Sequence, residues 1–327
     1  MMLLNRSTVA VICSLAGTLV GALVAPPQAN AQTWPAKPIH LIVNFPPGGT
    51  TDLMARAFTP KLAETLGQPV VIDNRGGAAG NIGLEVAAKA QPDGYTLLAS
   101  SGSPIVVGPH FYKLSINVDR DLAPIVPLAR ILTLLVVRPS LPVKSVPELT
   151  AYLRANNNKL NYGSVGTGST LHIHAERYLF ANKLRATHVP YKGAALMVTA
   201  LLSDQVDFAF DSGLSVQHVR SGKLRALAVA SSARSQLFPD VPTMAETGTE
   251  VNDALFGVYA PTGTPRAIIA RLNREIARIM QLPDSRAALA TFAAEPMALS
   301  PEEFTEIQRR DRERYGAFIK TAKIQAD

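Results

Sequence analysis

The segment Ile39–Asp52, with the sequence IHLIVNFPPGGTTD, decides the fold class. Its first half, Ile39–Phe45, is an apolar and β-rich run, which predicts a buried strand. Two glycines follow as a turn, and Thr51–Leu66 then repeats apolar residues near helical spacing until a glycine ends the helix. A strand that passes through a glycine turn into a helix predicts one unit of an α/β fold.

The same alternation returns along both halves of the chain. Further strands are predicted at Val70–Asp73, Tyr95–Ala99, Asn161–Gly163, Ala186–Val189, Val206–Phe210, Arg225–Ala230 and Leu255–Ala260. Further helices are predicted at Asn81–Ala90, Leu171–Lys183, Gly193–Leu202, Ser215–Ser221, Pro265–Met280 and Pro301–Lys320. Short apolar strands that alternate with helices predict mostly parallel sheets with helices on both faces.

Chain length and one long segment predict two lobes. A chain of 327 residues favours two domains over one. The β-rich segment Leu122–Arg138 is long enough to leave one sheet and enter another, and no low-complexity linker separates the two halves. We therefore expect the chain to cross more than once, with residues 32–133 and 253–327 in lobe 1 and residues 134–252 in lobe 2.

The N-terminus has the pattern of a secretory signal peptide. Arg6 precedes the mostly apolar run Thr8–Ala25, and residues 29–31 form a small-x-small site. We expect cleavage after Ala31 and a periplasmic location; an uncleaved membrane anchor is the alternative. Cys13 is the only cysteine, so the processed protein would have no disulfide, no thiolate nucleophile and no cysteine-bound metal.

Three glycine-rich loops, at residues 45–52, 74–81 and 164–170, each precede a predicted helix. A helix N-terminus presents unpartnered backbone N–H groups and the positive end of the helix dipole. Glycine lets a ligand approach that backbone, and Ser and Thr add hydroxyl donors. The loops match neither a P-loop nor the G-x-G-x-x-G motif, so carboxylates are better candidates than nucleotides. Ordinary tight turns are the alternative interpretation.

Two side chains near these loops are further candidates. Asp211 follows a predicted strand at the sheet edge where open α/β sheets bind ligands, and the alternative is that it caps the next short helix. His172 lies in the first turn of a predicted helix, where it either donates to a ligand or is a plain core or surface histidine. His172 and His174 point to different helix faces and cannot chelate a metal together.

Other classes of protein are disfavoured. Hydrophobic residues make up 47% and charged residues 17% of the chain, which excludes a disordered or collagen-like protein. The net charge of +7 mildly favours anionic partners, but no basic–aromatic pattern points to nucleic acid. Ser169 does not lie in a G-x-S-x-G motif, which leaves a serine hydrolase that uses Ser169 and His172 as a minor alternative. We expect no enzyme activity, cofactor or metal.

Several of these motifs together resemble one family, the periplasmic receptors of tripartite tricarboxylate transporters, or Bug receptors. The opening Trp34–Ile39 and the Phe45–Asp52 loop resemble the start of these proteins. The similarity continues in order and spacing through Asp73–Gly83, Pro92–Leu97, Gly166–His172, His188–Gly193, Gln205–Asp207 and Phe210-Asp211.

The resemblance implies a two-lobed Venus-flytrap fold of type II that closes on a small organic carboxylate and delivers it to membrane permease subunits. A ligand-sensing subunit of a membrane kinase is the alternative. We expect a monomer. Carried onto this chain, the ligand-binding residues are Pro47, Gly48, Gly49, Thr50, Ala78, Ala79, Gly80, Asn81, Thr167, Gly168, Ser169, Thr170, His172 and Asp211.

The chain departs from the family pattern in three places, one of which is the segment Ser212-Gly213-Leu214 after Asp211. The second loop reads RGGAAG at residues 75–80, where Pro-Gly-Ala-Gly-Gly is more usual, so Ala79 adds a methyl where the backbone favours a left-handed turn or a close approach. After Lys192-Gly193 the usual proline is absent. The identity of the carboxylate therefore stays open.

Overall fold

The computed structural model of this protein describes residues 34–231, 233–249, 251 and 254–325. The predicted signal peptide lies outside these residues. Within the described part, no helix combines the length and the apolar character needed to span a bilayer. The residues from Pro35 onward form one compact unit, which contains two β-sheets.

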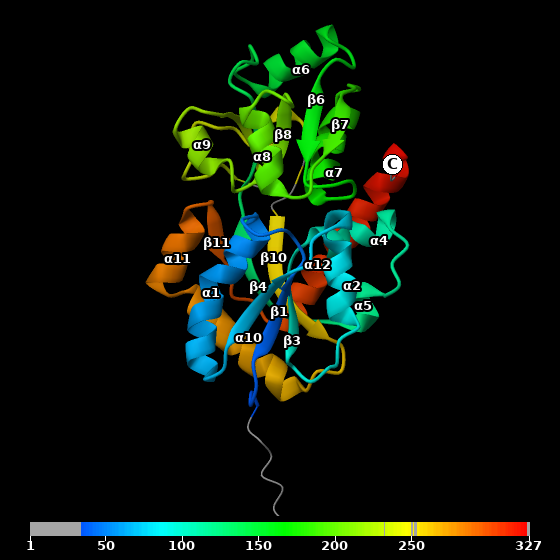
Figure 1. Cartoon of the computed structure of the whole chain (residues 1–327). Coiled ribbons are helices and arrows are strands. Elements are labelled where there is room, and N and C mark those ends of the chain that lie inside the picture. Colours follow the sequence, from blue (N-terminus) through cyan, green and yellow to red (C-terminus); the bar gives the residue numbers. More distant parts are fainter. Residues whose placement is uncertain (1–33, 232, 250, 252–253, 326–327) are drawn as a thin grey trace, which may run out of the picture. The chain divides into compact units, whose positions relative to one another are not determined.

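The first sheet has six strands in the order β11-β4-β10-β3-β1-β2 (Figure 1). β1 pairs in parallel with β2 and β3, whereas β10 runs antiparallel to both β3 and β4, and β11 antiparallel to β4. The strands are β1 Ile39–Val43, β2 Val70–Asn74, β3 Thr96–Ser101, β4 Leu122–Ile131, β10 Ala254–Pro261 and β11 Ala294–Pro296.

Helices cover both faces of this sheet, and we call the assembly lobe 1. α1 and α10 pack on one face, while α2, α3 and α12 enclose a core that contains Ile42, Leu98 and Phe304 on the other. Ser300 and Glu303 form a capping box that begins α12. The helices are α1 Thr50–Leu66, α2 Asn81–Ala88, α3 Ser103–Val106, α4 Gly108–Phe111, α5 Val118–Asp121, α10 Arg266–Met280, α11 Pro283–Ala290 and α12 Pro301–Ala322, with the 3-10 turn η1 Ala78–Gly80.

The second sheet has five strands in the order β7-β6-β8-β5-β9, and with its helices we call it lobe 2. Its core is built around Leu135, Tyr162 and Phe208. The strands are β5 Thr133–Val137, β6 Asn161–Ser164, β7 Thr187–Pro190, β8 Phe208–Ser212 and β9 Arg225–Ala230. The helices are α6 Val146–Ala155, α7 Thr170–Ala181, α8 Ala194–Leu202 and α9 Val216–Arg220, with the 3-10 turn η2 Ala245–Thr247.

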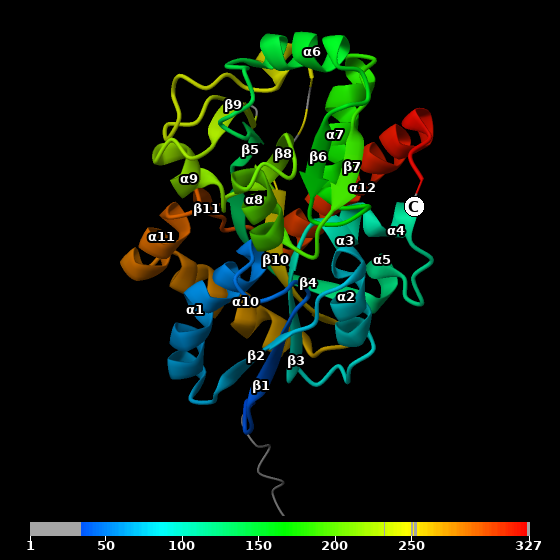
Figure 2. The ribbon, with the colours of Figure 1, turned by 45° about the horizontal axis from the view of Figure 1, so that its top comes forward.

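The chain passes between the sheets at Leu132, the single residue between β4 and β5 (Figure 2). β5 runs antiparallel to β8 and β9, while β6 pairs in parallel with β7 and β8. A strand that enters from the other lobe approaches from the edge where most strands of its new sheet end, so it must run against them. The expected two-lobed α/β fold is confirmed. Both sheets are mixed rather than purely parallel, because β5 and β10 cross between the lobes and because β11 also runs antiparallel to β4.

Helix α12 links the two lobes a second time. It belongs to lobe 1, yet it also packs against α7 of lobe 2. His174 Nε2 lies 3.0 Å from the Tyr315 hydroxyl, and the rings of Phe180 and Phe318 meet edge to face at 5.8 Å. A movement of the lobes relative to each other would have to disturb these contacts.

Some elements differ from the sequence prediction. α3, α4, α5 and β11 were not predicted, because none is longer than four residues. α6 and α11 were not predicted either, although Ser145 caps α6 and its buried Val146, Leu149 and Leu153 recur at helical spacing. β2 lies at the sheet edge and is only partly buried, unlike β1 and β3. β8 begins at Phe208 and runs through Asp211, later than the predicted Val206–Phe210.

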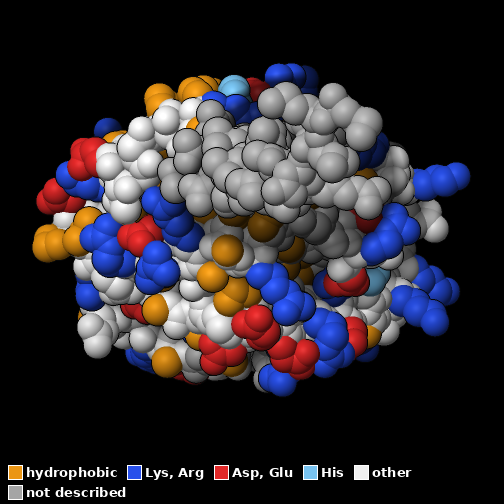
Figure 3. All heavy atoms as spheres, turned by 90° about the horizontal axis from the view of Figure 1, so that it is seen from below, with side chains coloured by type: hydrophobic (Ala, Val, Ile, Leu, Met, Phe, Trp, Pro, Cys, Tyr) orange, Lys and Arg blue, Asp and Glu red, His pale blue; other side chains and the backbone are white. Residues whose placement is uncertain are grey.

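The face of lobe 1 seen in Figure 3 carries Lys and Arg side chains interspersed with Asp and Glu. The formal net charge of +7 is therefore not gathered into one basic patch on this face. Mixed charges of this kind favour solubility rather than a strong field directed at one partner.

Candidate ligand site

A small cavity lies where the strand ends of both lobes meet. Its volume is about 40 Å³, enough for water but much less than a dicarboxylic acid requires. No Lys or Arg is among the residues that line it, and its polar groups are mostly hydroxyls. Lobe 1 contributes Phe45, Gly49, Thr50, Thr51, Ser101, Ser103 and Phe256, and lobe 2 contributes Val165, Thr170, Leu171, Ala194 and Ser212.

The first glycine loop leads into α1 and is held by a buried carboxylate. Gly48 has a φ of 75°, and its N–H donates to Asp52 Oδ2 at 3.0 Å. Arg56 Nε donates to the same oxygen at 2.8 Å, and Asn74 Nδ2 donates to Oδ1 at 3.1 Å. Burial raises the pKa of Asp52, but these hydrogen bonds outweigh it and hold the pKa below its ordinary value. Asp52 therefore stays charged and shapes the loop.

The second loop has the strained backbone that its sequence suggests. Ala78 and Ala79 have φ values of 46° and 51°, which L-residues adopt at a cost of about 1–2 kcal/mol each. A Cβ placed on Gly166 of lobe 2 would lie 3.4 Å from the Ala79 Cβ, so the second and third loops touch across the lobes. Asn81 Nδ2 donates to the Ala78 carbonyl at 2.7 Å, and its buried Oδ1 has no partner among the described groups.

The third loop leads into α7 and is capped by Ser169. The Ser169 hydroxyl accepts a hydrogen bond from the His172 backbone N–H at 3.2 Å, the usual role of an N-cap serine. The Gly168 N–H donates to His172 Nδ1 at 3.2 Å. Thr170 is buried and lines the cavity. The loop thus turns its helix N-terminus toward lobe 1.

The two lobes are joined by direct hydrogen bonds at this site. Thr50 Oγ1 donates to the Ser212 carbonyl at 2.9 Å. Ser103 Oγ lies 2.9 Å from Thr170 Oγ1 and accepts from the Thr170 N–H at 3.0 Å. The Tyr112 hydroxyl donates to the Thr167 carbonyl at 2.6 Å. The lobes are therefore closed on each other, and their hydroxyls satisfy one another.

His172 and Asp211 lie near the site but do not line the cavity. His172 is buried and stacks on His188 with ring centroids 4.1 Å apart. Burial, followed by the effect of His188, lowers the pKa of His172 to about 3. Asp211 is fully buried, and its Oδ2 accepts from the Ser215 N–H at 2.7 Å, immediately before α9. Burial raises its pKa.

Of the fourteen candidates from the sequence, Gly49, Thr50 and Thr170 line the cavity. Pro47, Gly48 and Ala78 are exposed on the loops around it. Ser101, Ser103 and Ser212 line the cavity but were not among these candidates, although the run Ser100–Ser103 after the third predicted strand indicates a hydroxyl-rich loop at the same sheet edge. Among the described residues, no group of three or more His, Asp or Glu side chains is placed to hold a metal.

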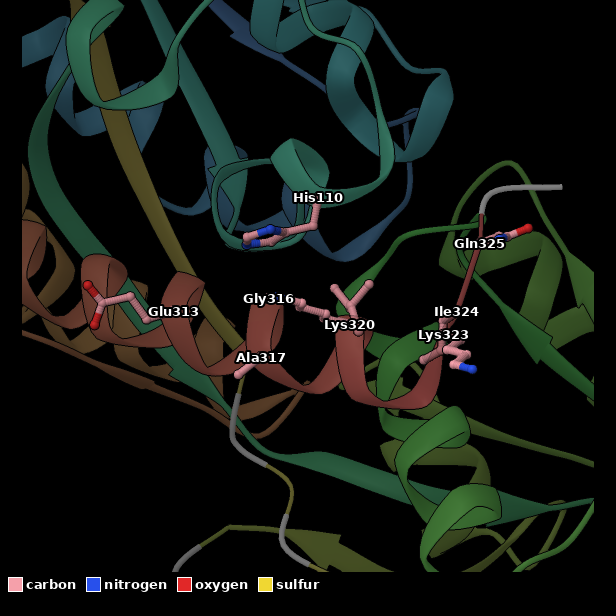
Figure 4. A pocket seen from close by; sticks show the side chains of 9 residues that line it. His110, Glu313, Gly316, Ala317, Lys320, Lys323, Ile324 and Gln325 are labelled. Carbon is pink, nitrogen blue, oxygen red and sulfur yellow. The ribbon is translucent and has the colours of Figure 1, made fainter.

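A larger hollow of about 630 Å³ lies elsewhere, along the C-terminal half of α12. His110 of α4 projects over this helix at Gly316, and its Nε2 lies 3.0 Å from the Arg312 carbonyl (Figure 4). Lys320 and Lys323 line the hollow together with Glu313. None of the candidate ligand residues belongs to it.

Comparisons with known proteins agree with this architecture. The family model described as "Tripartite tricarboxylate transporter family receptor" matches residues 54–324. Protein BugT of Bordetella pertussis is 40% identical over 282 residues, which cover 84% of this chain and 86% of BugT. An R. palustris protein solved with adipate has a TM-score of 0.85 at 34% identity, covering 89% of this chain and 99% of that protein. MatC from Rhodopseudomonas palustris, solved with bound malate, has a TM-score of 0.82 at 32% identity. The match covers 87% of this chain and 99% of MatC.

The family match spans most of the chain, and the predicted resemblance is confirmed. Solved structures in the same comparison are periplasmic binding proteins, which also agrees with the two-lobed fold. These proteins bind solutes and do not catalyse reactions. The chain belongs to the receptor family of the tripartite tricarboxylate transporters and is a solute-binding receptor, not an enzyme.

Proposed function

We propose that this receptor binds a small dicarboxylate between its lobes in the periplasm and delivers it to a membrane permease. The observation that carries the proposal is the interlobe cavity, which is lined by hydroxyls and by the first residues of α1, α3, α7 and α8, with no Lys or Arg among the lining residues. Neutral dipoles of this kind replace the water around an anion without a bound counter-charge. Adipate and malate, found on two related proteins, are both dicarboxylates.

The three glycine loops supply the donors in this proposal. Residues 47–50 and 78–81 act from lobe 1 and residues 167–170 from lobe 2, with Ser101, Ser103 and Ser212 added to them. A micromolar dissociation constant corresponds to about −8 kcal/mol. Hydrogen bonds to a charged group contribute roughly 1.5–3 kcal/mol each, so four to six of them suffice after the costs of ordering.

Ligand binding then exchanges one set of interlobe contacts for another. In the structure the lobes are joined by bonds from Thr50 to Ser212 and between Ser103 and Thr170. A carboxylate can take over these hydroxyls only after the lobes part, because the cavity is too small to admit it. Only donors that reach the ligand on reclosure shift the balance toward the closed form. That form is what the permease would recognise.

The remaining assignments complete the proposal. Removal of residues 1–31 would release a monomeric protein whose lobe 1 comprises residues 32–133 and 253–327 and whose lobe 2 comprises residues 134–252, except that the boundary residue Thr133 begins β5 and so belongs with lobe 2. N-terminal sequencing of the exported protein tests the first point, with Gln32 as the expected first residue.

A thermal-shift screen tests ligand capture. Malate, adipate and citrate are compared with adipamide, the neutral analogue of adipate. We expect at least one acid to raise the melting temperature and the diamide to leave it unchanged. An equal shift with acid and diamide would contradict an anion site.

A matched pair of variants locates the site. Thr50→Val removes a hydroxyl from the cavity, and we expect about a tenfold loss of affinity for the best acid by calorimetry. Thr65→Val makes the same change on the exposed side of α1, where its hydroxyl bonds to the Lys61 carbonyl, and should leave affinity unchanged. Equal affinities of the two variants would place the ligand elsewhere.

A further inference from the structure

The third loop is held by two histidines that come from different elements. His172 belongs to α7 and His188 to β7, and their rings stack at 4.1 Å with an interplanar angle of 17°. The ring of Tyr162 from β6 lies beside the pair, 4.9 Å from that of His188 and 6.2 Å from that of His172, and nearly parallel to both. Phe111 of lobe 1 meets His172 edge to face, with ring centroids 6.0 Å apart. The pair therefore sits in an aromatic box behind the loop.

Each histidine is connected to a different glycine of the loop. His172 Nδ1 accepts from the Gly168 N–H at 3.2 Å. His188 Nε2 lies 2.6 Å from Ser164 Oγ, which in turn accepts from the Gly166 N–H at 3.1 Å. Gly166 and Gly168 have φ values of 125° and 74°, which the conformational freedom of glycine permits and which other residues rarely adopt. Two points of attachment remove that freedom.

The chemistry of these bonds requires His172 to be neutral. A ring nitrogen that accepts from a backbone N–H carries no proton, so the single proton of His172 must reside on Nε2. A protonated Nδ1 would face the Gly168 N–H donor to donor and push the loop away. The box agrees with a neutral ring, since burial lowers the pKa of His172 to about 3.

The held loop is one of the parts of lobe 2 that contact lobe 1. Gly166 packs against Ala79, and the Thr167 carbonyl accepts from Tyr112. A rotation of the peptides between Gly166 and Gly168 would misdirect these contacts and the N–H groups at the start of α7. The orientation of the donors thus depends on groups that do not themselves line the cavity.

We propose that the stacked pair His172–His188 positions the lobe 2 ligand loop, with His172 acting through Nδ1 as a neutral acceptor for the Gly168 N–H. His172 is then a positioning residue rather than a ligand donor. The proposal rests on the proposed function for the identity of the loop, but the loop's attachment can be measured without ligand.

Three variants of α7 test it. His172→Asn keeps an acceptor close to the place of Nδ1, whereas His172→Phe keeps the ring stack and removes the acceptor. His174→Phe is the matched control: it removes another buried histidine two residues away, whose Nε2 contacts Tyr315 and not the loop. Hydrogen exchange of the Gly168 amide is measured in unliganded protein labelled with ¹⁵N-glycine, and affinities for malate and adipate are then measured by calorimetry.

We expect His172→Phe to speed Gly168 exchange about tenfold and to weaken binding of the better acid about fivefold, the worth of one hydrogen bond. His172→Asn should restore most of both, and His174→Phe should leave Gly168 exchange unchanged, because its contact is with Tyr315 and not with the loop. Unchanged Gly168 exchange in His172→Phe, or equal behaviour of the Asn and Phe variants, would overturn the proposal. If wild-type protein binds neither acid, the proposed function fails while the exchange result still decides the positioning role.

A measurement on the wild-type protein covers the case in which His172→Phe does not fold. Nitrogen chemical shifts of ¹⁵N-labelled histidine report which ring nitrogen carries the proton. We expect His172 at pH 7 to show an unprotonated Nδ1 and a protonated Nε2. A proton on Nδ1 would contradict the proposal whatever the variants do.

Discussion

The first and third loops each hold the N–H of a left-handed glycine in place before a helix, but they use different side chains to do so. Both place a left-handed glycine before a helix N-terminus, Gly48 before α1 and Gly168 before α7. In lobe 1 the glycine N–H is bound by the ionised carboxylate of Asp52, which is paired with Arg56. In lobe 2 it is bound by the neutral imidazole of His172.

The difference teaches how charge is arranged around an anion site. A carboxylate beside the first loop would repel an anionic ligand if Arg56 did not balance it, since opposite charges in contact cancel at a distance. The third loop needs no such balance, because its support carries no charge. The two loops should therefore respond differently to pH and to the loss of their supporting groups.

Lowering the pH should weaken the histidine support of the third loop before the carboxylate support of the first loop. This is the largest effect on stability that we expect. The pKa values of buried His172 and His174 fall from 6.5 to about 3 in the folded chain. As pH falls from 6.5 toward 3, these two histidines become protonated in the unfolded chain but stay neutral in the folded chain. The free energy of unfolding should decrease by about 1.4 kcal/mol per pH unit for each histidine.

The buried carboxylates Asp52 and Asp211 do not cause this loss of stability between pH 6.5 and about 4. The pKa of Asp52 lies below its ordinary value of 3.8, so its support is lost only as pH falls below about 4. Asp211 has a raised pKa and takes up a proton earlier in the folded chain, which stabilises that chain as pH falls. Urea unfolding at pH 7, 6 and 5 measures the slope, which His172→Phe and His174→Phe should each reduce; an unaltered slope would be evidence against the histidines as its cause.

Removing the charge that holds the first loop should have the next largest effect. Asp52→Asn replaces a buried acceptor of three hydrogen bonds by an amide, and we expect a loss of about 1–3 kcal/mol in urea unfolding. Asp73→Asn is the control, because the Asp73–Arg75 pair is more exposed and such pairs contribute about 0–1 kcal/mol. Equal losses of stability in Asp52→Asn and Asp73→Asn would show that the burial of Asp52 does not strengthen its hydrogen bonds.

Removing the Ser169 cap of the third loop should have a smaller effect on stability, and it can be compared directly with removing another serine cap in the same lobe. Ser169→Ala should cost about 1 kcal/mol, as should Ser145→Ala, since both serines cap helices of lobe 2. Only the first cap lies beside the cavity, so Ser169→Ala alone should also weaken carboxylate binding. A loss of affinity with Ser145→Ala would mean that general stability, not the loop, controls binding.

The smallest effect is expected at the contact between the second and third loops. Ala79→Gly removes a left-handed alanine, and the gain is reduced by the greater freedom of glycine in the unfolded chain, leaving about 0.5 kcal/mol of stabilisation. Ala63→Gly, within helix α1, should instead destabilise by about 0.5–1 kcal/mol. If both variants lost stability equally in urea, the strain at Ala79 would be disproved.

Local pattern was enough to predict most strands and the helices that follow them. The segment Ile39–Phe45 became β1 over Ile39–Val43, and Thr51–Leu66 became α1 over Thr50–Leu66. Period and glycine position are local properties, so they can be recognised in one sequence. The crossing at Leu122–Arg138 was also suggested by length alone, but its location at Leu132 depends on which sheet pairs with each half.

The candidate site divides in the same way. The loops are visible as glycine clusters before helices, and Ser169 is recognisable as a helix cap. The stacking of His172 on His188 joins residues from two elements, and the spacing of these residues in the sequence does not predict it. Ser103 and Thr170 are 67 positions apart, yet they share a hydrogen bond between lobes.

The amino-acid sequence by itself determined the family, the alternation of strands and helices, and the places where helix N-termini are exposed. Each of these follows from neighbours in the chain or from motifs in a definite order. Only the tertiary structure decided that the lobes meet through their own hydroxyls, that Asp52 is charged and His172 neutral, and which polar groups face the cavity. Those properties depend on burial and on partners from distant segments, because the pKa of a group and the freedom of a loop are set by what surrounds them in space.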